Sequence, residues 1–403
     1  MFCQLKISLF FAKATEKTIS KIRKYMTEFA VMPSMRFLWA AGPAADFDNT
    51  CIYNCAFGKI NAVEAFAECL YILMCGTGYG FSVEQEEVEK LPEVPEIKSG
   101  QALAKVVIDD SKAGWADSVK TLMGSLYDGQ NIYFDYSEIR PEGARLNTMG
   151  GRASGPQPLV KLHDFIRETM HNAQGRKLTT LEAHDICNQI AEIVVVGGVR
   201  RSSQISLSDL DDQDMRHAKE WPFPIKRAMA NNSAIFREKP SAAQFLKEWA
   251  SLALSGTGER GIFNLSAAQS RAPSRRYAPK IQGTNPCGEI MLRDMEFCNL
   301  SEVVVREDDD LDSLLDKVET ATLTHWYSND AVDGYVKLFY DALRGDQSHF
   351  VHSEEVLESW RIVEDLLCTG EKCPVRTVPY LYMGGNWGPT HKTDFITKWD
   401  YPA

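Results

Sequence analysis

Residues 283–300 place two cysteines and a carboxylate in one short stretch, GTNPCGEIMLRDMEFCNL. Cys287 stands between a proline and a glycine, which favours a constrained loop over a helix face. Glu289 follows closely enough to serve that thiol as a general base or a hydrogen-bond acceptor. Cys298 could return to the same pocket on a following strand, and two-electron redox chemistry beside a separate reactive thiol would need a third cysteine. Loops often carry reactive groups, but most cysteines are simply buried, and the spacing leaves both interpretations open.

The composition predicts a globular chain that has no nucleic-acid or membrane partner. Its 403 residues, 44% hydrophobic and 25% charged, are enough for one large core or for two to three domains. A net charge of −11 argues against a nucleic-acid surface, which is normally basic. No apolar run reaches the roughly 18 residues of a membrane-spanning helix, and residues 1–17 make a poor signal peptide. We therefore expect a cytoplasmic protein.

The ten cysteines predict neither a disulfide framework nor a metal site. A chain of this length without an export signal is not expected to form five disulfides. The spaced pairs Cys51/Cys55 and Cys368/Cys373 lack the second pair of ligands that structural zinc requires. The glycines of GTGYGF at 76–81 do not fit a dinucleotide-binding turn, and we interpret them as the capped end of a helix.

Helical and strand periodicities alternate along the chain and predict an α/β fold. Strands are expected at 81–85 and 131–137. Helices are expected at 14–29, 62–74, 159–170, 178–196, 242–254 and 311–323. Two aspartate-rich runs, at 208–214 and 306–310, lack the pattern of a calcium-binding loop, and we interpret both as solvated.

Ordered motifs across residues 20–323 resemble the adenosylcobalamin-dependent ribonucleoside-triphosphate reductases of the monomeric type, many of which are phage-borne. Blocks occur in the family's order at compatible spacing: MPSMRFLWAAGPA, NTCIYNCAF, GTGYGFSVE, RPEGARLNTMGGRASGPQPL, DICNQIAEIVVVGGVRRSSQISLSDLDDQDM, ANNSAIF and GTNPCGEI with EFCNLSEV. The resemblance implies an incomplete ten-stranded α/β barrel, because the family continues for several hundred residues beyond this part. The remainder would include much of the cobalamin site and a pair of cysteines that reduces the active-site disulfide.

The resemblance also implies a role for each residue of the cysteine-bearing loop. Cys287 would carry the thiyl radical that removes the 3′-hydrogen of the substrate. Glu289 would be the base on the 3′-hydroxyl, and Asn285 would hydrogen-bond the substrate hydroxyls. Cys55 and Cys298 would reduce the 2′-carbon and become a disulfide, so their Cα atoms should approach within roughly 4.4–6.8 Å.

Nucleotide contacts are implied for two further segments. The loop GGRASGP at 150–156 resembles the one that links effector binding to substrate choice, and its glycines would let backbone N–H groups approach an anionic nucleotide. The expected contacts, for which ordinary turn residues are the alternative, are Gly151, Ser154, Gly155, Asn232 and Ser233. The implied cofactor is adenosylcobalamin. The implied partners are a ribonucleoside triphosphate substrate, a deoxynucleotide effector and a thioredoxin-type reductant.

The last 80 residues differ from the rest of the chain. Trp and Tyr together number 12 in residues 1–323 and 10 in residues 324–403. Residues 328–395 resemble the C-terminal end of glucose-6-phosphate dehydrogenase, through YDALRGDQ, EEVLESWRIV and GGNWGP. We therefore expect a reductase-like part at 1–323 and a small α+β tail at 324–403, with an apolar helix at 331–345.

Two alternative functions remain open at this point. The chain could be a fragment of an NADP-dependent glucose-6-phosphate dehydrogenase, which the missing nucleotide fingerprint disfavours. It could also be a non-catalytic fusion that binds a nucleotide or a partner.

Overall fold

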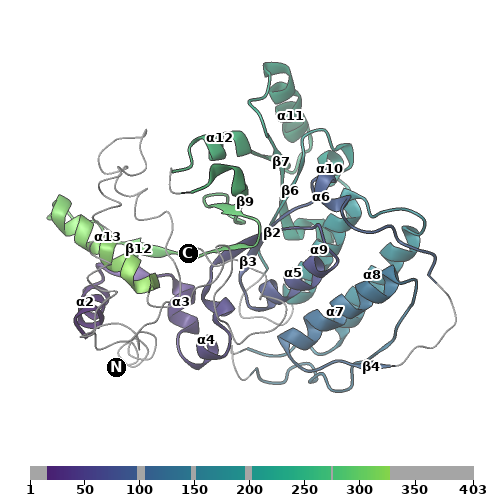
Figure 1. Ribbon diagram of the computed structural model, residues 1–403, viewed down its shortest axis with the longest axis horizontal. Coiled ribbons are helices and arrows are strands. Elements are labelled where there is room, and N and C mark those ends of the chain that lie inside the picture. The colour runs from purple at the N-terminus through teal and green to yellow at the C-terminus, as the bar shows by residue number, and fades with distance from the viewer. Residues whose placement is uncertain (1–15, 98–104, 147–150, 196–201, 274–275, 327–403) are drawn as a thin grey trace, which may run out of the picture.

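The computed structural model describes residues 16–97, 105–146, 151–195, 202–273 and 276–326 (Figure 1). A six-stranded sheet organises this part of the chain. In spatial order its strands are β11 (Glu296–Cys298), β2 (Cys55–Lys59), β3 (Gly78–Ser82), β6 (Gln204–Asp209), β7 (Ala230–Ile235) and β8 (Gly261–Phe263). The strands from β2 to β8 pair in parallel, and β11 pairs antiparallel with β2.

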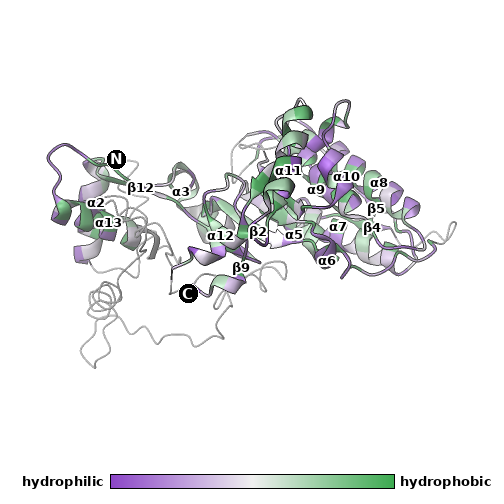
Figure 2. Cartoon of the chain, turned by 90° about the horizontal axis from the view of Figure 1, so that it is seen from above, coloured by the Kyte–Doolittle hydropathy of each residue, from purple (hydrophilic) through white to green (hydrophobic). Residues whose placement is uncertain are grey.

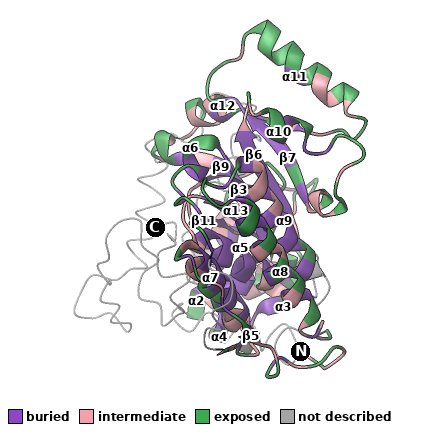
Figure 3. Ribbon diagram, turned by 90° about the vertical axis from the view of Figure 1, so that its right-hand side faces the viewer, coloured by how far each residue is buried: buried purple, intermediate pink, exposed green. Residues whose placement is uncertain are grey.

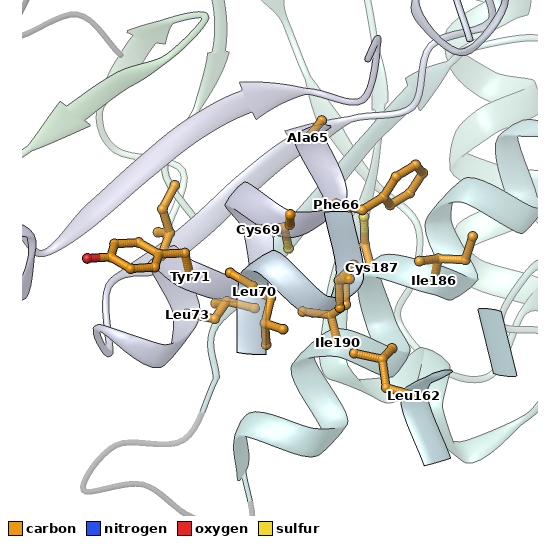
Figure 4. Packing of buried hydrophobic residues seen from close by; sticks show 14 of the residues in the cluster. Ala65, Phe66, Cys69, Leu70, Tyr71, Leu73, Leu162, Ile186, Cys187 and Ile190 are labelled. Atoms are coloured by element: carbon orange, nitrogen blue, oxygen red, sulfur yellow. The ribbon is translucent and has the colours of Figure 1, made fainter. Parts of the chain in front are cut away.

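Helices cover one face of this sheet because parallel strands need long crossover connections. The main helices are α5 (Glu64–Met74), α7 (Lys112–Tyr127), α8 (Gln157–Asn172) and α9 (Thr180–Val195). Figure 4 shows their packing, with Cys69 of α5 and Cys187 of α9 in one buried cluster with Leu162 of α8. The sheet contributes alternate side chains to this cluster, including Tyr79 and Phe81. The opposite face carries a second apolar cluster, which includes Cys55 and Cys298.

Shorter elements connect and extend this framework. Near the start of the chain lie α2 (Glu16–Thr27), β1 (Val31–Pro33), α3 (Met35–Ala40), α4 (Pro43–Phe47) and η1 (Asn49–Ile52). Between β3 and β7 lie α6 (Gln85–Val88), β4 (Val106–Val107), β5 (Phe134–Asp135), α10 (Gln213–His217) and η2 (Ile225–Met229). After β7 come α11 (Ala242–Leu254), α12 (Leu265–Ser270), η3 (Ala278–Lys280), β9 (Ile281–Thr284), β10 (Met291–Arg293), β12 (Ser301–Val303) and α13 (Leu311–Trp326).

Helices α2 and α13 lie side by side, at the opposite end of the molecule from α7 and α8 (Figure 2). Lys21 forms ion pairs with Asp316 at 2.7 Å and with Glu319 at 2.5 Å. Leu323 packs with Ile22 in a small apolar cluster. The expected boundary between residues 323 and 324 therefore falls inside a continuous helix that contacts the N-terminal one.

The mixed α/β fold agrees with the sequence prediction, and the sheet does not close into a barrel within the described residues. The strand expected at 81–85 begins earlier, at Gly78, so two glycines of GTGYGF are strand residues. Gly76 alone follows the helix in the expected way, with φ of +75°. The strand expected at 131–137 is reduced to the two residues of β5. The tail at 324–403, with its expected helix at 331–345, lies outside the described residues after Trp326.

The aspartate-rich runs are more structural than expected. Asp212 accepts a hydrogen bond from the backbone N–H of Met215 and so caps α10. Asp309 forms an ion pair with Lys317 at 2.5 Å, with both side chains more than nine-tenths buried. Several residues of both runs are exposed, as expected for solvated segments, and Asp212 and Asp309 have structural partners in addition. Among the described helices, none is long and apolar enough to cross a membrane.

Candidate active site

Cys55 and Cys298 lie directly opposite each other in the sheet. The pairing of β2 with β11 aligns the two residues in register, although 242 positions separate them in the chain. Opposite Cα atoms in an antiparallel pair are roughly 4.5–5.5 Å apart, which is inside the range that a disulfide bridges. The strand pairing therefore brings Cys55 and Cys298 together, as the redox pair implied by the resemblance requires.

The two thiols also interact directly. The hydrogen bond with Cys55 and the burial of the site raise the pKa of the Cys298 thiol well above its usual value. The Glu289 carboxylate adds to this rise, so the electrostatic field of that side chain reaches the thiol pair. Cys298 consequently keeps its proton at neutral pH and can deliver hydrogen together with electrons.

The loop between β9 and β10 carries Cys287 at its exposed tip. Asn285 closes this loop, because its backbone N–H donates to the carbonyl of Ile290 at 3.1 Å. Its side-chain Oδ1 accepts the backbone N–H of Ile290 at 3.0 Å. Gly288 turns the chain with φ of +85°, in the left-handed region that favours glycine. Glu289 is exposed beside it, so the side chains of Cys287 and Glu289 are both accessible on a fixed turn.

Two glycines of β3 allow this loop to approach the cysteine pair. A Cβ at Gly80 would lie 2.1 Å from the carbonyl oxygen of Thr284, which leaves no room for any side chain. A Cβ at Gly78 would lie 3.2 Å from Cys55 Sγ and 3.2 Å from Pro286 Cγ. The residue before Cys287 therefore lies close to the Cys55 thiol. Sequence reasoning assigned these glycines to a helix end and missed this role.

Asn285 links the Cys287 loop to the Cys55 thiol in the protein interior. The residue is fully buried, and its Nδ2 lies 3.9 Å from Cys55 Sγ. Its oxygen is already used in closing the loop, so the expected hydrogen bond to substrate hydroxyls stays a prediction. Its observed contacts are structural.

A buried carboxylate that sequence reasoning also missed fixes the strand that carries Cys298. Glu296 accepts hydrogen bonds from the backbone N–H of Arg293 at 2.6 Å and from the guanidinium of Arg276 at 2.9 Å. Arg276 also donates to the carbonyl of Met291 at 2.8 Å. These bonds tie β10 to β11, so the Cys287 loop and Cys298 are positioned by one ionic cluster. A buried charge with several partners is costly to disturb.

The expected nucleotide contacts at 151–155 lie in a different region, immediately before α8. Gly151 and Gly155 have φ of +85° and +71°, and a Cβ at Gly155 would meet the backbone nitrogen of Glu142 at 3.0 Å. Ser154 donates a long hydrogen bond, 3.4 Å, to the carbonyl of Gly155. These residues thus form a tight turn, and their proposed contact with an effector stays a prediction.

Asn232 and Ser233 lie on β7, which β3 and β6 separate from β2. Successive strand residues face opposite sides of a sheet. By the strand register, Ser233 shares the face of Cys55, whereas Asn232 faces the other side. The backbone N–H of Asn232 donates to Glu259 at 2.6 Å. The structure therefore does not bring Asn232 to the Cys287 loop.

Three domain families, from two kinds of enzyme, match parts of the chain. Residues 84–170 match the insertion domain of B12-dependent ribonucleotide reductase. Residues 198–327 match the barrel domain of ribonucleotide reductase. Residues 306–401 match the C-terminal domain of glucose-6-phosphate dehydrogenase, which overlaps the barrel match along α13.

The similar curated proteins are named adenosylcobalamin-dependent ribonucleoside-triphosphate reductases. The protein from Lacticaseibacillus paracasei is 31% identical over 57% of this chain and 36% of its own length. The one from Lactobacillus gasseri is 31% identical over 68% and 45%, and the one from Euglena gracilis is 28% identical over 79% and 46%. The chain thus spans less than half the length of these relatives. They are bacterial and euglenoid, and they lend no support to the expected phage source.

A solved structure supports the same relationship. The crystal structure of a B12-dependent, class II ribonucleotide reductase superposes with a TM-score of 0.65 at 25% identity, over 78% of this chain and 51% of that one. The barrel-domain match covers the loop that carries Cys287 and the strand that carries Cys298. The N-terminal part of the chain, about 300 residues, is therefore homologous to the class II, adenosylcobalamin-dependent ribonucleotide reductases.

Proposed function

We propose that this chain carries the substrate-reducing centre of a ribonucleotide reductase, which converts a ribonucleoside triphosphate to its 2′-deoxy form. The observation that carries the proposal is the register of Cys55 opposite Cys298, with the Cys287 loop held beside them. Three thiols at one site match the chemical need of the reaction. One thiol must carry a radical, and two others must supply a pair of electrons.

In the proposed reaction, Cys287 as a thiyl radical takes the 3′-hydrogen atom of the ribose. Glu289 accepts the proton of the 3′-hydroxyl, while the 2′-hydroxyl takes a proton from the thiol pair and leaves as water. Cys55 and Cys298 together supply two electrons and two hydrogens and end as a disulfide. The 3′-hydrogen then returns from Cys287, and Glu289 returns its proton to the 3′-oxygen. The net change is ribonucleotide plus dithiol to deoxyribonucleotide plus disulfide plus water.

The burial of Cys298 and the exposure of Cys287 agree with the different roles proposed for them. Cys298 is buried and its raised pKa keeps it protonated, as a donor of hydrogen must be. Cys287 is exposed at the tip of its loop. Because Cys287 is exposed, a radical source that is not part of the described residues can reach its thiol.

The expected cofactor is adenosylcobalamin, which when bound supplies the radical that Cys287 needs. The exposed Cys287 thiol is compatible with such a source. The proposed partners are a thioredoxin-type dithiol, which would reduce the Cys55–Cys298 disulfide, and a deoxynucleotide effector at the 150–156 loop.

A single-turnover assay tests this function. The full chain is incubated with adenosylcobalamin, cytidine triphosphate and deoxyadenosine triphosphate, and deoxycytidine triphosphate is measured by mass spectrometry. We expect at most one product per chain and none from Cys287→Ser. Product from the Cys287→Ser chain would reject the role of this thiol. Repeated turnover with thioredoxin would show that the chain needs no further part of a barrel.

A further inference from the structure

A lysine, a cysteine and a carboxylate meet in the helix-covered layer of the molecule. Cys75 directly follows α5, which is almost entirely buried (Figure 3), and the cysteine is itself 0% exposed. Lys112 is the first residue of α7, and its Nζ lies 3.2 Å from Cys75 Sγ. Asp48, which is 4% exposed, joins them from the N-terminal end of η1. A side-chain amine and a thiol from different elements are therefore in direct contact.

One carboxylate oxygen contacts both the nitrogen and the sulfur. Asp48 Oδ2 accepts hydrogen bonds from Lys112 Nζ at 2.6 Å and from Cys75 Sγ at 3.3 Å. The hydroxyl of Tyr71 donates to the same oxygen at 2.9 Å. Burial opposes a charge on Asp48, but Lys112 and these hydrogen bonds lower the pKa of the carboxyl to about 2. The carboxylate is therefore charged at neutral pH and is placed to relay a proton between the two atoms.

Both the thiol and the amine are protonated at rest. Burial, together with Asp48, raises the pKa of the Cys75 thiol. Burial alone would lower the pKa of Lys112, but Cys75 and Asp48 outweigh it and raise that pKa. A protonated thiol reacts slowly with oxidants, so the cluster persists as an ion pair and changes only under sustained oxidation. The side chain of Lys112 is 24% exposed, so the cluster reaches solvent on its lysine side.

We propose that Cys75 and Lys112 are a modification site, at which hydrogen peroxide forms a sulfur–nitrogen bond between the two side chains. Peroxide first oxidises the thiol to a sulfenic acid and releases one water. Asp48 takes a proton from the ammonium, and the freed amine attacks the sulfur and displaces its hydroxyl. The hydroxyl leaves as water with the proton held by Asp48, and the nitrogen loses a further proton to solvent.

Atoms and electrons balance in this reaction. The net change is thiol plus ammonium plus hydrogen peroxide to sulfenamide plus two waters plus one proton. The sulfur loses the two electrons that the peroxide gains. A sulfenic acid condenses in the same way with a backbone nitrogen, and the Lys112 amine is a stronger nucleophile than an amide.

The bond joins two segments of different kinds. Lys112 lies within residues 84–170, which match the insertion domain of the reductases, whereas Cys75 precedes that segment. The chain runs on from Cys75 to Gly78, which lies against the Cys55 thiol. The two linked residues are 37 positions apart, so the bond restricts the unfolded chain and stabilises the fold, as a disulfide does. The inference does not rest on the proposed function, because neither residue takes part in it.

Peptide mapping of the native full chain tests the inference. The chain is treated with hydrogen peroxide, alkylated in denaturant without reductant, digested and analysed by mass spectrometry. We expect a peptide that links Cys75 to Lys112, lighter by two hydrogens than the sum of the separate peptides. Dithiothreitol should cleave this link, because thiols reduce a sulfur–nitrogen bond. Peroxide should also move the urea midpoint of the parent chain further upward than that of Lys112→Arg.

Two variants and one matched control identify the partners. Lys112→Arg keeps a positive charge beside Asp48, but its guanidinium is a poor nucleophile, so the link should be lost. Cys75→Ser keeps a hydroxyl beside Asp48 and should also lose the link. Lys120→Arg changes an exposed lysine of the same helix and should leave the yield of the link unchanged.

Three results would overturn the inference. The first is Cys75 recovered after peroxide only as a free thiol, as a sulfinic acid or in a disulfide with Cys51. The second is a Cys75 link to an amine that persists in Lys112→Arg. The third is an equal yield of the link when the chain is denatured before peroxide is added, because the fold would then not direct the reaction.

Discussion

At the scale of single residues, the two ends of the Asn285 amide have different partners, which the sequence does not reveal. Its Oδ1 closes the Cys287 loop through Ile290, and its Nδ2 faces Cys55. The family resemblance implied only that Asn285 hydrogen-bonds the substrate. A resemblance suggests the role of a residue, but it does not reveal the hydrogen bonds that the residue makes within the protein. The observed hydrogen bonds show that the residue positions the loop that carries Cys287.

Substitution of Asn285 tests this positioning role. Asn285→Ala leaves the part-buried N–H of Ile290 without this acceptor, which should lower the free energy of unfolding by about 1–3 kcal/mol. Urea denaturation measures the effect. Cys287→Ser, at an exposed position of the same loop, should change stability by less than about 0.5 kcal/mol. Equal stability of the Asn285→Ala and parent chains would show that the loop is held by other contacts.

Two buried histidines make stability depend on pH. Burial lowers the pKa of His163 and of His184 to about 3. In the unfolded chain each binds a proton below a pKa of about 6.5, so protons favour unfolding. The free energy of unfolding should fall as the pH drops from about 6.5 towards 3, by up to about 1.4 kcal/mol per pH unit for each histidine.

Urea denaturation at pH 7.0 and at pH 5.0 measures this dependence. His184→Gln removes one of the two groups, so its stability should vary with pH less steeply than that of the parent chain. The difference between the two slopes gives the contribution of His184 to the pH dependence, separate from that of the carboxylates. An unchanged slope would mean that His184 is protonated in the folded chain.

At the scale of elements, strand β3 is where the sequence was least informative. Glycines weaken a strand, and the pattern GTGYGF therefore indicated a helix end. The strand forms because Tyr79 and Phe81 pack into the helix-covered core while Gly78 and Gly80 face the Cys287 loop. Only the tertiary approach of a loop some 200 residues later explains these glycines, so no local pattern could have found them.

Gly80→Ala should displace the Cys287 loop. The added Cβ would meet the carbonyl oxygen of Thr284 at 2.1 Å, and backbone must move to relieve this contact. We expect a loss of about 2 kcal/mol or more in unfolding free energy, within the range of overpacked cores. Gly124→Ala is the control, because a Cβ at this helical position meets nothing within 4 Å. It should raise stability by about 0.5–1 kcal/mol. Equal changes in unfolding free energy for Gly80→Ala and Gly124→Ala would show that the Thr284 carbonyl does not lie against Gly80.

The helices were easier to predict than their contacts. The segment 242–254 matches α11 residue for residue, and its capping box at Ser241 is local in sequence. Its apolar residues Phe245, Leu246 and Trp249 are spaced as in a core-facing helix, but all three are exposed. The buried side of the helix carries Glu248 instead, whose ion pairs with Arg216 and Arg260 come from other elements.

At the scale of the whole molecule, the first helix of the described residues, α2, packs against the last one, α13. The expected boundary between 323 and 324 came from a change in family resemblance, which does not report packing. Leu323 is buried against α2, and α13 continues to Trp326. The sequence on both sides of the expected boundary at 323 thus belongs to one packed helix, α13.

Limited proteolysis tests this packing. We expect no cleavage within 311–326 in the parent chain, since a packed helix resists proteases. Leu323→Asp buries a charge between α2 and α13 and should make this segment susceptible. Leu315→Asp is the control, because Leu315 is 39% exposed on the same helix and should stay protected. Rapid cleavage within 311–326 of the parent chain would show that α13 is not stably docked.

The central claim is that Cys55 and Cys298 form the redox pair of the site, with Cys287 distinct from it. The most direct measurement is disulfide mapping of the native full chain after brief oxidation with diamide, followed by alkylation, digestion and mass spectrometry. We predict a peptide that links Cys55 to Cys298, with Cys287 still alkylated and Cys51 unlinked. Separately alkylated Cys55 and Cys298 after oxidation, or a link from Cys55 to Cys51 instead, would contradict the account.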